Sequence, residues 1–417
     1  MNQYMEQFME QFKYDGLTFD DVSLVTDYAD FMPDETVIAS KLTTRISVNI
    51  PIVSAAMDTV TEQEMALSMA MLGGIGIIHR NLTQVEQARQ VAMVKHHLNG
   101  LIKDPIVFRD TDTLDIVLER KAKKAYAFSG FPILDANNNL VGILSAADIK
   151  FARDEKVRVA EIMTSQVISA PEGTSLQDSY QIMKKHKIGK LPLIKAGKLT
   201  GLYSFADVKT LVEKSDTMIN RDEKYRLRVG AAVGTSDHER IAALASEDVD
   251  VIVVDTAHGD SKNVLEMISW TKKNFPRIDV IGGNIATGEA ALRLRNAGAD
   301  GVKVGIGPGS ICTTRVVAGV GVPQITAIYN CAKALQGSIP IIADGGIRHS
   351  GDVPKAIVAG ADTVMIGGLL AGTEESPGEK IFHQGRQYVA YRGMGSLGAM
   401  KESQGSRGRY MLSLIHI

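Results

Sequence analysis

Short apolar runs recur along the chain, and a stretch with helical spacing follows most of them. The apolar runs lie at residues 50–58, 74–79, 228–234, 249–255, 279–284, 301–305, 339–344 and 361–367. The helical stretches lie at residues 61–71, 82–95, 238–246, 262–274, 289–297, 324–336 and 353–359. Near-continuous apolar runs are typical of parallel strands buried on both faces. Eight such strands with intervening helices predict an α/β fold, the TIM (β/α)8 barrel.

An internal repeat interrupts this alternation after the second apolar run. Residues 131–134 and 140–149 recur as residues 191–194 and 199–208. Two copies are too few for a solenoid, so the repeat indicates two similar subdomains packed on each other. Each copy also contains a helical stretch, at residues 113–121 and 175–185.

The predicted organisation therefore has three parts. Residues 1–96 form the first part of the barrel, residues 97–212 the inserted pair, and residues 213–417 the rest of the barrel with part of a flap. Ahead of the first apolar run, residues 17–25 are predicted to be extended.

The candidate chemistry lies in the loops that follow the strands, because these loops form the active-site face of a TIM barrel. Residues 305–315 (GIGPGSICTTR) follow the sixth strand and carry Cys312. Glycines let this loop turn tightly and approach a ligand. The alternative is a structural cysteine in a tight turn, since free cysteine is often buried. The position of Cys312 on the catalytic face favours a nucleophile.

The loops after the seventh and eighth strands carry phosphate-site signals. Asp344 precedes two glycines, and a further Gly-Gly pair stands at residues 367–368. Phosphate sites in TIM barrels often use these two loops, where Asp344 could also accept hydrogen bonds from ribose hydroxyls. The alternative is that these residues only form the ordinary turns that follow barrel strands. Asp255 and Asn284 end adjacent strands and could contact a second ligand.

Composition restricts the class of protein further. The 417 residues carry a formal net charge of −2, which offers no argument for nucleic acid or an anionic membrane as partner. No apolar run reaches membrane-spanning length, and residues 1–13 do not form a signal peptide. The only two cysteines, Cys312 and Cys331, imply no disulfide framework and fit a reducing cytoplasm. His258 could act as a base, although a loop histidine without a catalytic role is the favoured interpretation.

Residues 14–410 resemble the bacterial inosine-5'-monophosphate (IMP) dehydrogenase family. The motifs that carry the resemblance stand at residues 17–22, 55–62, 73–79, 305–315, 342–347 and 391–396. The family oxidises IMP to xanthosine monophosphate (XMP) with NAD, in the committed step toward guanine nucleotides. The repeat at residues 97–212 resembles a tandem pair of CBS domains (a Bateman module), so the resemblance implies a TIM barrel with this module inserted.

The resemblance implies a covalent mechanism. Cys312 would attack C2 of the purine, hydride would leave to the nicotinamide, and water would hydrolyse the resulting thioimidate. Thr314 would position or activate that water. Arg409 and Tyr410 match the family's catalytic pair, in which the arginine is the proposed base. Arginine is nearly always protonated, so the alternative for Arg409 is a solvated charge in a polar loop.

The resemblance also implies binding residues. Those for IMP are Met57, Asn284, Ser310, Asp344, Gly345, Gly346, Gly367, Gly368, Tyr391, Gly393, Met394 and Gly395. Those for NAD are Asp255, Gly305, Ile306 and Gly307. The carbonyls of Gly307, Gly309 and Cys312 resemble a potassium site, since hard cations take oxygen ligands.

For the inserted pair, the resemblance implies adenine or guanine nucleotides, with Asp148 and Asp207 contacting ribose. The alternative is that Ser145 and Ser204 cap helices and the aspartates favour the helix N-termini. The family forms homotetramers, which the CBS pairs join into octamers.

The end of the chain departs from the family, and two alternative functions stay open. The family normally continues beyond this length, and residues 411–417 do not match it. We therefore expect a truncated or frame-shifted end without the eighth helix, and impaired stability or turnover. The first alternative is GMP reductase, against which stand the inserted pair, residues 391–396 and the pair Arg409 and Tyr410. The second is a nucleotide-sensing regulator that has lost catalysis.

Overall fold

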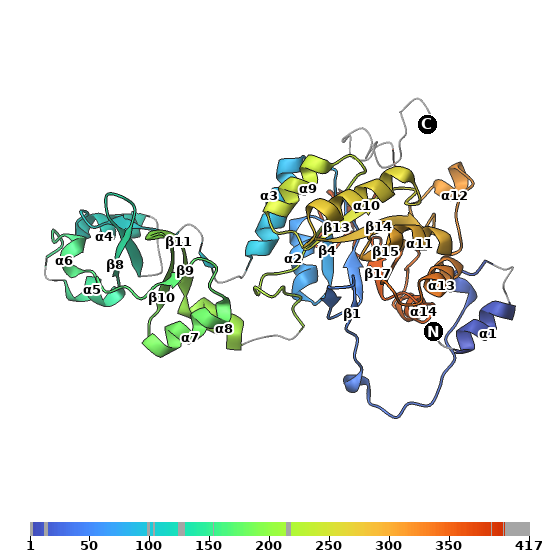
Figure 1. The fold of residues 1–417 in the computed structure, drawn as a ribbon, viewed down its shortest axis with the longest axis horizontal. Coiled ribbons are helices and arrows are strands. Elements are labelled where there is room, and N and C mark those ends of the chain that lie inside the picture. The colour runs from blue at the N-terminus through green and yellow to red at the C-terminus, as the bar shows by residue number, and fades with distance from the viewer. Residues whose placement is uncertain are drawn as a thin grey trace. The chain divides into compact units, whose positions relative to one another are not determined.

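The computed structural model describes residues 3–11, 16–97, 101–102, 105–123, 130–152, 154–213, 218–384, 386–394 and 396. The chain divides into two compact units (Figure 1). One unit comprises residues 1–97, 217–222 and 227–417, and the other comprises residues 98–216 and 223–226.

The larger unit is a closed barrel of parallel strands. In spatial order these are β12 (Gly230–Val233), β13 (Val251–Asp255), β14 (Asp279–Ile285), β15 (Gly301–Val304), β16 (Ile341–Asp344), β17 (Thr363–Ile366), β3 (Ile52–Ser54) and β4 (Ile75–Ile78). Closure is made where β17 pairs with β3, with Val364 opposite Ile52. Each strand lies within a predicted apolar run or extends it by one residue, and the predicted TIM barrel is confirmed.

Helices follow the barrel strands and surround them (Figure 1). They are α2 (Gln63–Met71), α3 (Gln84–His96), α9 (His238–Ser246), α10 (Lys262–Asn274), α11 (Gly288–Asn296), α13 (Gln324–Leu335) and α14 (Asp352–Val358). Capping side chains start two of them: Thr83 accepts from the Glu86 amide, and Thr287 accepts from the Ala290 amide. The helical periodicity predicts each boundary to within two residues. In the described part of residues 367–394, no helix follows β17.

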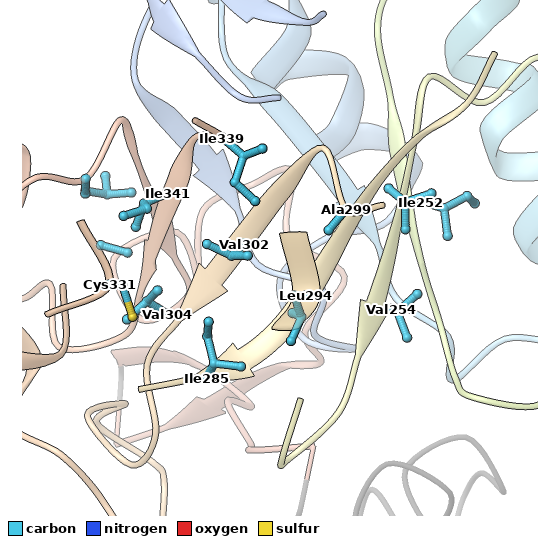
Figure 2. Close-up of a cluster of buried hydrophobic side chains, with 14 of the residues drawn as sticks. Ile252, Val254, Ile285, Leu294, Ala299, Val302, Val304, Cys331, Ile339 and Ile341 are labelled. Carbon is cyan, nitrogen blue, oxygen red and sulfur yellow. The ribbon is translucent and has the colours of Figure 1, made fainter. Parts of the chain in front are cut away.

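The barrel unit buries apolar side chains in two layers. One layer fills the space between the strands and the surrounding helices, and it includes Ile285, Leu294, Val302 and Cys331 (Figure 2). The second layer fills the barrel interior and includes Ile77, Val253, Ile281, Ile342 and Met365. Burial on both faces explains why the strands read as continuous apolar runs.

The smaller unit contains two sheets. One has the order β5 (Leu101–Ile102), β11 (Lys198–Ser204), β10 (Lys190–Lys195) and β9 (Ala170–Pro171), and the other β6 (Phe108–Arg109), β7 (Phe131–Leu134) and β8 (Leu140–Leu144). Its helices are α4 (Leu114–Lys123), α5 (Ala146–Phe151), α6 (Val159–Ile162), α7 (Leu176–His186) and α8 (Phe205–Glu213). The repeated segments form β7, β8 and α5 in one half and β10, β11 and α8 in the other. The Leu140 amide donates to the Gly197 carbonyl at 3.1 Å and joins the halves.

The prediction for residues 17–25 is wrong in part, because a 3-10 turn, η1 (Phe19–Asp21), stands where extended chain is predicted. The Asp21 carboxylate causes it by accepting from the amide and the hydroxyl of Thr18 at 2.6 and 2.8 Å. Further short elements have no counterpart in the prediction: α1 (Gln3–Gln11), η2 (Pro33–Glu35), β1 (Ser40–Lys41), β2 (Ser47–Val48), α12 (Thr314–Val317), β18 (Lys380–His383) and β19 (Arg386–Val389). Within the described residues, no helix is long and apolar enough to cross a membrane.

Candidate active site

Cys312 stands in the loop after β15 and is partly exposed. Its thiol donates to the Thr314 hydroxyl at 3.2 Å, and its amide donates to the Gly309 carbonyl at 3.0 Å. The backbone hydrogen bond closes a tight turn over residues 309–312, and the hydrogen bond to Thr314 orients the thiol. The loop therefore presents an accessible sulfur beside a hydroxyl, as a nucleophile requires.

The cysteine loop packs closely against the loop after β16. A side chain at Gly305 would collide with the backbone carbonyl of Asp344. Gly345 has φ +93°, and a β-carbon there would lie 2.9 Å from the Pro308 ring. Gly346 faces the Phe19 ring and Pro308 in the same way. Only glycine suits such contacts, so these residues bring the backbone of Asp344 next to the cysteine loop.

A second group of predicted residues gathers around the Gly367 and Gly368 pair. A β-carbon at Gly367 would lie 3.0 Å from the Met57 sulfur and 3.2 Å from the Tyr391 hydroxyl. A β-carbon at Gly368 would lie 3.5 Å from the Ser310 hydroxyl. Burial raises the pKa of Tyr391, and a hydrogen bond with Ser310 opposes this shift. Loops from three strands thus bring hydroxyl groups and open backbone together, as a phosphate site needs.

Residues 391–394 are tied to three barrel loops. The Arg392 guanidinium binds the Asp58 carboxylate with 2.7 and 3.2 Å contacts. A β-carbon at Gly393 would lie 3.4 Å from the Ile311 carbonyl. Met394 is only 3% exposed, and the Asn81 amide group lies 3.9 Å from its sulfur. These contacts hold the segment against the loops that begin at β3, β4 and β15.

Asp255, Asn284 and Asp344 meet at one buried lysine, Lys303 of β15. Its ammonium donates to Asp344 at 2.6 Å and lies 3.1 Å from an Asp255 carboxylate oxygen. It also donates to the side-chain oxygen of Asn284. The Asn284 amide group in turn donates to Asp344 at 2.9 Å and to the Gly305 carbonyl at 2.8 Å.

The predicted cation ligands are three backbone carbonyls of one loop. The Gly309 carbonyl accepts the Cys312 amide and keeps one lone pair. In the described part of the chain, no hydrogen bond is donated to the carbonyls of Gly307 or Cys312. Open carbonyl acceptors fit a monovalent cation that prefers oxygen ligands. No group of three or more acidic, histidine or cysteine side chains suited to a metal occurs among the described residues.

Several predicted residues lie elsewhere. Gly395, Arg409 and Tyr410 lie outside the described residues. His258 is exposed, and its neighbour Asp260 pairs with Arg293 at 2.6 Å. In the smaller unit, Asp148 and Ser145 cap each other reciprocally at 2.7 and 3.2 Å, so the alternative capping role is present. Asp207 stands in the first turn of α8.

Sequence reasoning missed Lys303 and the Asp58–Arg392 pair. Lys303 had a detectable signal, since a charged residue interrupts the apolar run at residues 301–305. The His79 and Glu62 pair was missed as well: the ring nitrogen lies 3.1 Å from the carboxylate, and this hydrogen bond lowers the pKa of Glu62. A histidine directly after a buried strand is the matching signal in the sequence.

The fold and this site define a barrel enzyme with a partly exposed cysteine among the glycine-rich loops that follow its strands. A model of the "IMP dehydrogenase / GMP reductase domain" matches residues 16–416. The chain belongs to this family, and the resemblance found in the sequence is confirmed.

Curated relatives that match nearly the whole chain carry the name inosine-5'-monophosphate dehydrogenase. The protein from Aquifex aeolicus is 53% identical over 403 residues, which cover 95% of this chain and 81% of the relative. That from Chlorobaculum tepidum is 49% identical and covers 96% of this chain and 82% of the relative. That from Staphylococcus aureus is 49% identical with the same coverage.

Solved structures of GMP reductase are also similar. A variant from Trypanosoma brucei in complex with guanosine 5'-monophosphate has a TM-score of 0.78 and 37% identity, and covers 96% of this chain and 85% of that chain. The same enzyme with guanosine 5'-triphosphate has a TM-score of 0.72 and 39% identity, and covers 87% and 88% of the two chains. The match to the complex with guanosine 5'-monophosphate covers 96% of this chain, so it includes most of the predicted insert at residues 97–212. The argument that the inserted pair speaks against GMP reductase is therefore wrong.

Proposed function

We propose that this chain is an NAD-dependent IMP dehydrogenase that oxidises IMP to XMP through a covalent bond to Cys312. The observation that carries the proposal is the Cys312 thiol beside Thr314, in a loop packed against Asp344 and next to the group formed by Ser310, Gly367, Gly368 and Tyr391. The relatives from three bacterial genera that bear the dehydrogenase name support the same activity.

The Cys312 sulfur supplies the reaction's nucleophile. As a thiolate it adds to C2 of the purine, which becomes tetrahedral. NAD, when bound, accepts the hydride that leaves C2, and the purine remains attached to Cys312 as a thioimidate. Water then adds to the same carbon, the C–S bond breaks, and XMP is released with the thiol restored. The Thr314 hydroxyl, 3.2 Å from the sulfur, lies where it can orient that water.

The substrate's phosphate and ribose are assigned to the loops after β15, β16 and β17. Ser310, Tyr391 and the amides of Gly346, Gly367 and Gly368 would hold the phosphate, and Asp344 would accept from the ribose hydroxyls. Met57 would pack on the base. The rest of the IMP site would be lined by Gly345, Gly393, Met394 and Gly395, and Asn284 would lie beside that site. The geometry favours this assignment because Met57, Ser310 and Tyr391 converge on one glycine pair.

Asp255 and the backbone of residues 305–307 are assigned to NAD, and the carbonyls of Gly307, Gly309 and Cys312 to potassium. Bound potassium would hold the cysteine loop in one conformation. Arg409 and Tyr410, which lie outside the described residues, are assigned to water activation. Because potassium would hold the cysteine loop, removal of potassium should slow turnover.

For the smaller unit we propose a tandem CBS module that binds adenine or guanine nucleotides, with Asp148 and Asp207 near ribose. The repeated strand–strand–helix pattern of its two halves supports this assignment. The assembly is proposed to be a homotetramer that can pair into an octamer, and the location is proposed to be the cytoplasm.

GMP reductase is the second candidate, and the similarity to the Trypanosoma brucei structures favours it. The deciding experiment follows nicotinamide absorbance with the purified chain. Formation of NADH from IMP and NAD supports the dehydrogenase. Consumption of NADPH with GMP, without IMP oxidation, supports the reductase and contradicts the proposal.

A further inference from the structure

Lys303 is a fully enclosed cation at the centre of the proposed site. Its side chain is 2% exposed, although it stands in the middle of a barrel strand of otherwise apolar residues. A buried ammonium is costly unless charged and polar partners surround it. Here the ammonium donates hydrogen bonds to Asn284 and Asp344, and an Asp255 carboxylate oxygen lies 3.1 Å away as an ion-pair partner.

These three partners belong to different sides of the proposed site. Asp255 ends β13 and is assigned to the cofactor, whereas Asp344 ends β16 and is assigned to the ribose of IMP. Asn284 lies between them near the end of β14 and donates to Asp344 at 2.9 Å. One ammonium therefore spans strands β13 to β16 and touches both acids.

We propose that Lys303 is a positioning residue that holds the cofactor acid and the ribose acid in one network. The inference rests on the proposed function, because the two acids take their roles from it. Lys303 acts through Asp255 and Asp344, and the network makes each acid's orientation depend on the other. A change on the cofactor side should therefore weaken IMP binding, although no contact with IMP is removed.

The barrel contains a matched control at its other end. Lys95 is also fully buried, and its ammonium lies 2.9 Å from Asp222 and 2.8 Å from Asp250. Asp250 directly precedes β13, while Asp255 ends the same strand. Lys95 thus reproduces the chemistry of a buried lysine between two aspartates, away from the proposed site.

The test measures KM for IMP and for NAD, kcat and melting temperature in Lys303→Met, Lys95→Met, Asp255→Asn and the double variant Lys303→Met/Asp255→Asn. Lys303→Met should raise both KM values by about tenfold or more, because small displacements of binding groups are costly. Lys95→Met should lower the melting temperature and leave both KM values within about twofold. In the double variant, the increase in KM for NAD should be no larger than in Lys303→Met alone, since linked groups are not additive.

Asp255→Asn keeps the size of the side chain, and it tests the coupling between the two acids if Lys303→Met does not fold. It should raise KM for IMP about threefold or more, because Lys303 loses one of its two charged partners. Unchanged KM values in Lys303→Met, additive effects in the double variant, or an unchanged KM for IMP in Asp255→Asn would each overturn the inference. If the unaltered chain reduces GMP and does not oxidise IMP, the proposed function fails instead, and the same variants are then compared with GMP and NADPH.

Discussion

The Cys312 sulfur lies 3.2 Å from the hydroxyl oxygen of Thr314, and the thiol donates to it. Thr314 is the first residue of the short helix α12, and its neighbour Thr313 precedes that helix. The start of the helix therefore places Thr314, and the hydrogen bond places its hydroxyl beside the atom that is proposed to attack IMP. The proposed reaction has two chemical steps at this sulfur, and Thr314 is assigned only to the second.

Thr314→Ala should separate those two steps. Hydride transfer needs Cys312, so a rapid burst of NADH should persist, while hydrolysis of the thioimidate slows on the order of 100-fold. Rapid mixing with IMP and NAD should show one equivalent of NADH followed by slow turnover. Thr314→Ser keeps the hydroxyl and should retain most of the steady-state rate. Loss of the burst in Thr314→Ala would contradict this division of roles.

Breaking the Asp58–Arg392 pair should weaken IMP binding more than it slows chemistry. The pair has a 2.7 Å contact, and Asp58 is 7% and Arg392 28% exposed, so Asp58→Asn removes the charge that faces a partly buried guanidinium. We expect Asp58→Asn to raise KM for IMP about tenfold with little change in kcat, because residues 391–394 lose their main anchor.

The control for this pair is the exposed ion pair of Arg158 and Glu161 in the smaller unit. Glu161→Gln should leave KM for IMP unchanged, since exposed pairs contribute little. An unchanged KM for IMP in Asp58→Asn would show that Arg392 does not hold the substrate segment.

The two cysteines should differ sharply in reactivity. Burial raises the pKa of Cys331 to about 12, and the side chain is fully buried, whereas Cys312 is partly exposed. The thiolate is the reactive form. An alkylating reagent at pH 8 should therefore label the folded chain once, at Cys312, and the unfolded chain twice. Mass spectrometry of peptides checks the position, and labelling of Cys331 in the folded chain would contradict the expectation.

Cys331 should also make the barrel less stable in alkali. Its folded pKa lies above the ordinary value of 9.0, so its contribution is complete below pH 9 and is lost as pH rises toward 12. Between pH 8 and pH 10 the unfolding free energy should fall by about 1.4 kcal/mol more than in Cys331→Ala.

The only tryptophan, Trp270 on α10, packs against His238 and Phe275 and reports barrel unfolding by fluorescence. Denaturant titrations of the unaltered chain and of Cys331→Ala, each at pH 8 and pH 10, give the unfolding free energies to be compared. If the unfolding free energy falls equally in both proteins between pH 8 and pH 10, Cys331 ionises freely in the folded barrel and the expectation is wrong.

The sequence predicts the barrel well because each strand is buried on both faces and each helix has one apolar side. The runs at residues 249–255 and 301–305 needed no tertiary information to be recognised as strands. The 3-10 turn at Phe19–Asp21 escaped prediction because a single side chain, Asp21, bonds to local backbone. Local hydrogen bonds of this kind leave no periodic signal.

The candidate site was predicted in its loops but not in its internal contacts. Glycine pairs and Cys312 stand out in the sequence, while Asp58 and Arg392 are separated by 334 positions and meet only through folding. Lys303 could be seen as a charge in an apolar strand, but its three partners depend on the pairing of β13, β14, β15 and β16. Pairwise contacts across a barrel are set by register, which a pattern of apolar residues does not specify.

The most direct test of the central claim is intact-mass spectrometry of the chain after it is mixed with IMP and NAD and quenched in acid. The account predicts a covalent nucleotide adduct on Cys312 that forms together with NADH, and no adduct and no NADH in Cys312→Ala. An adduct that persists in Cys312→Ala, or NADH formation by that variant, would contradict it.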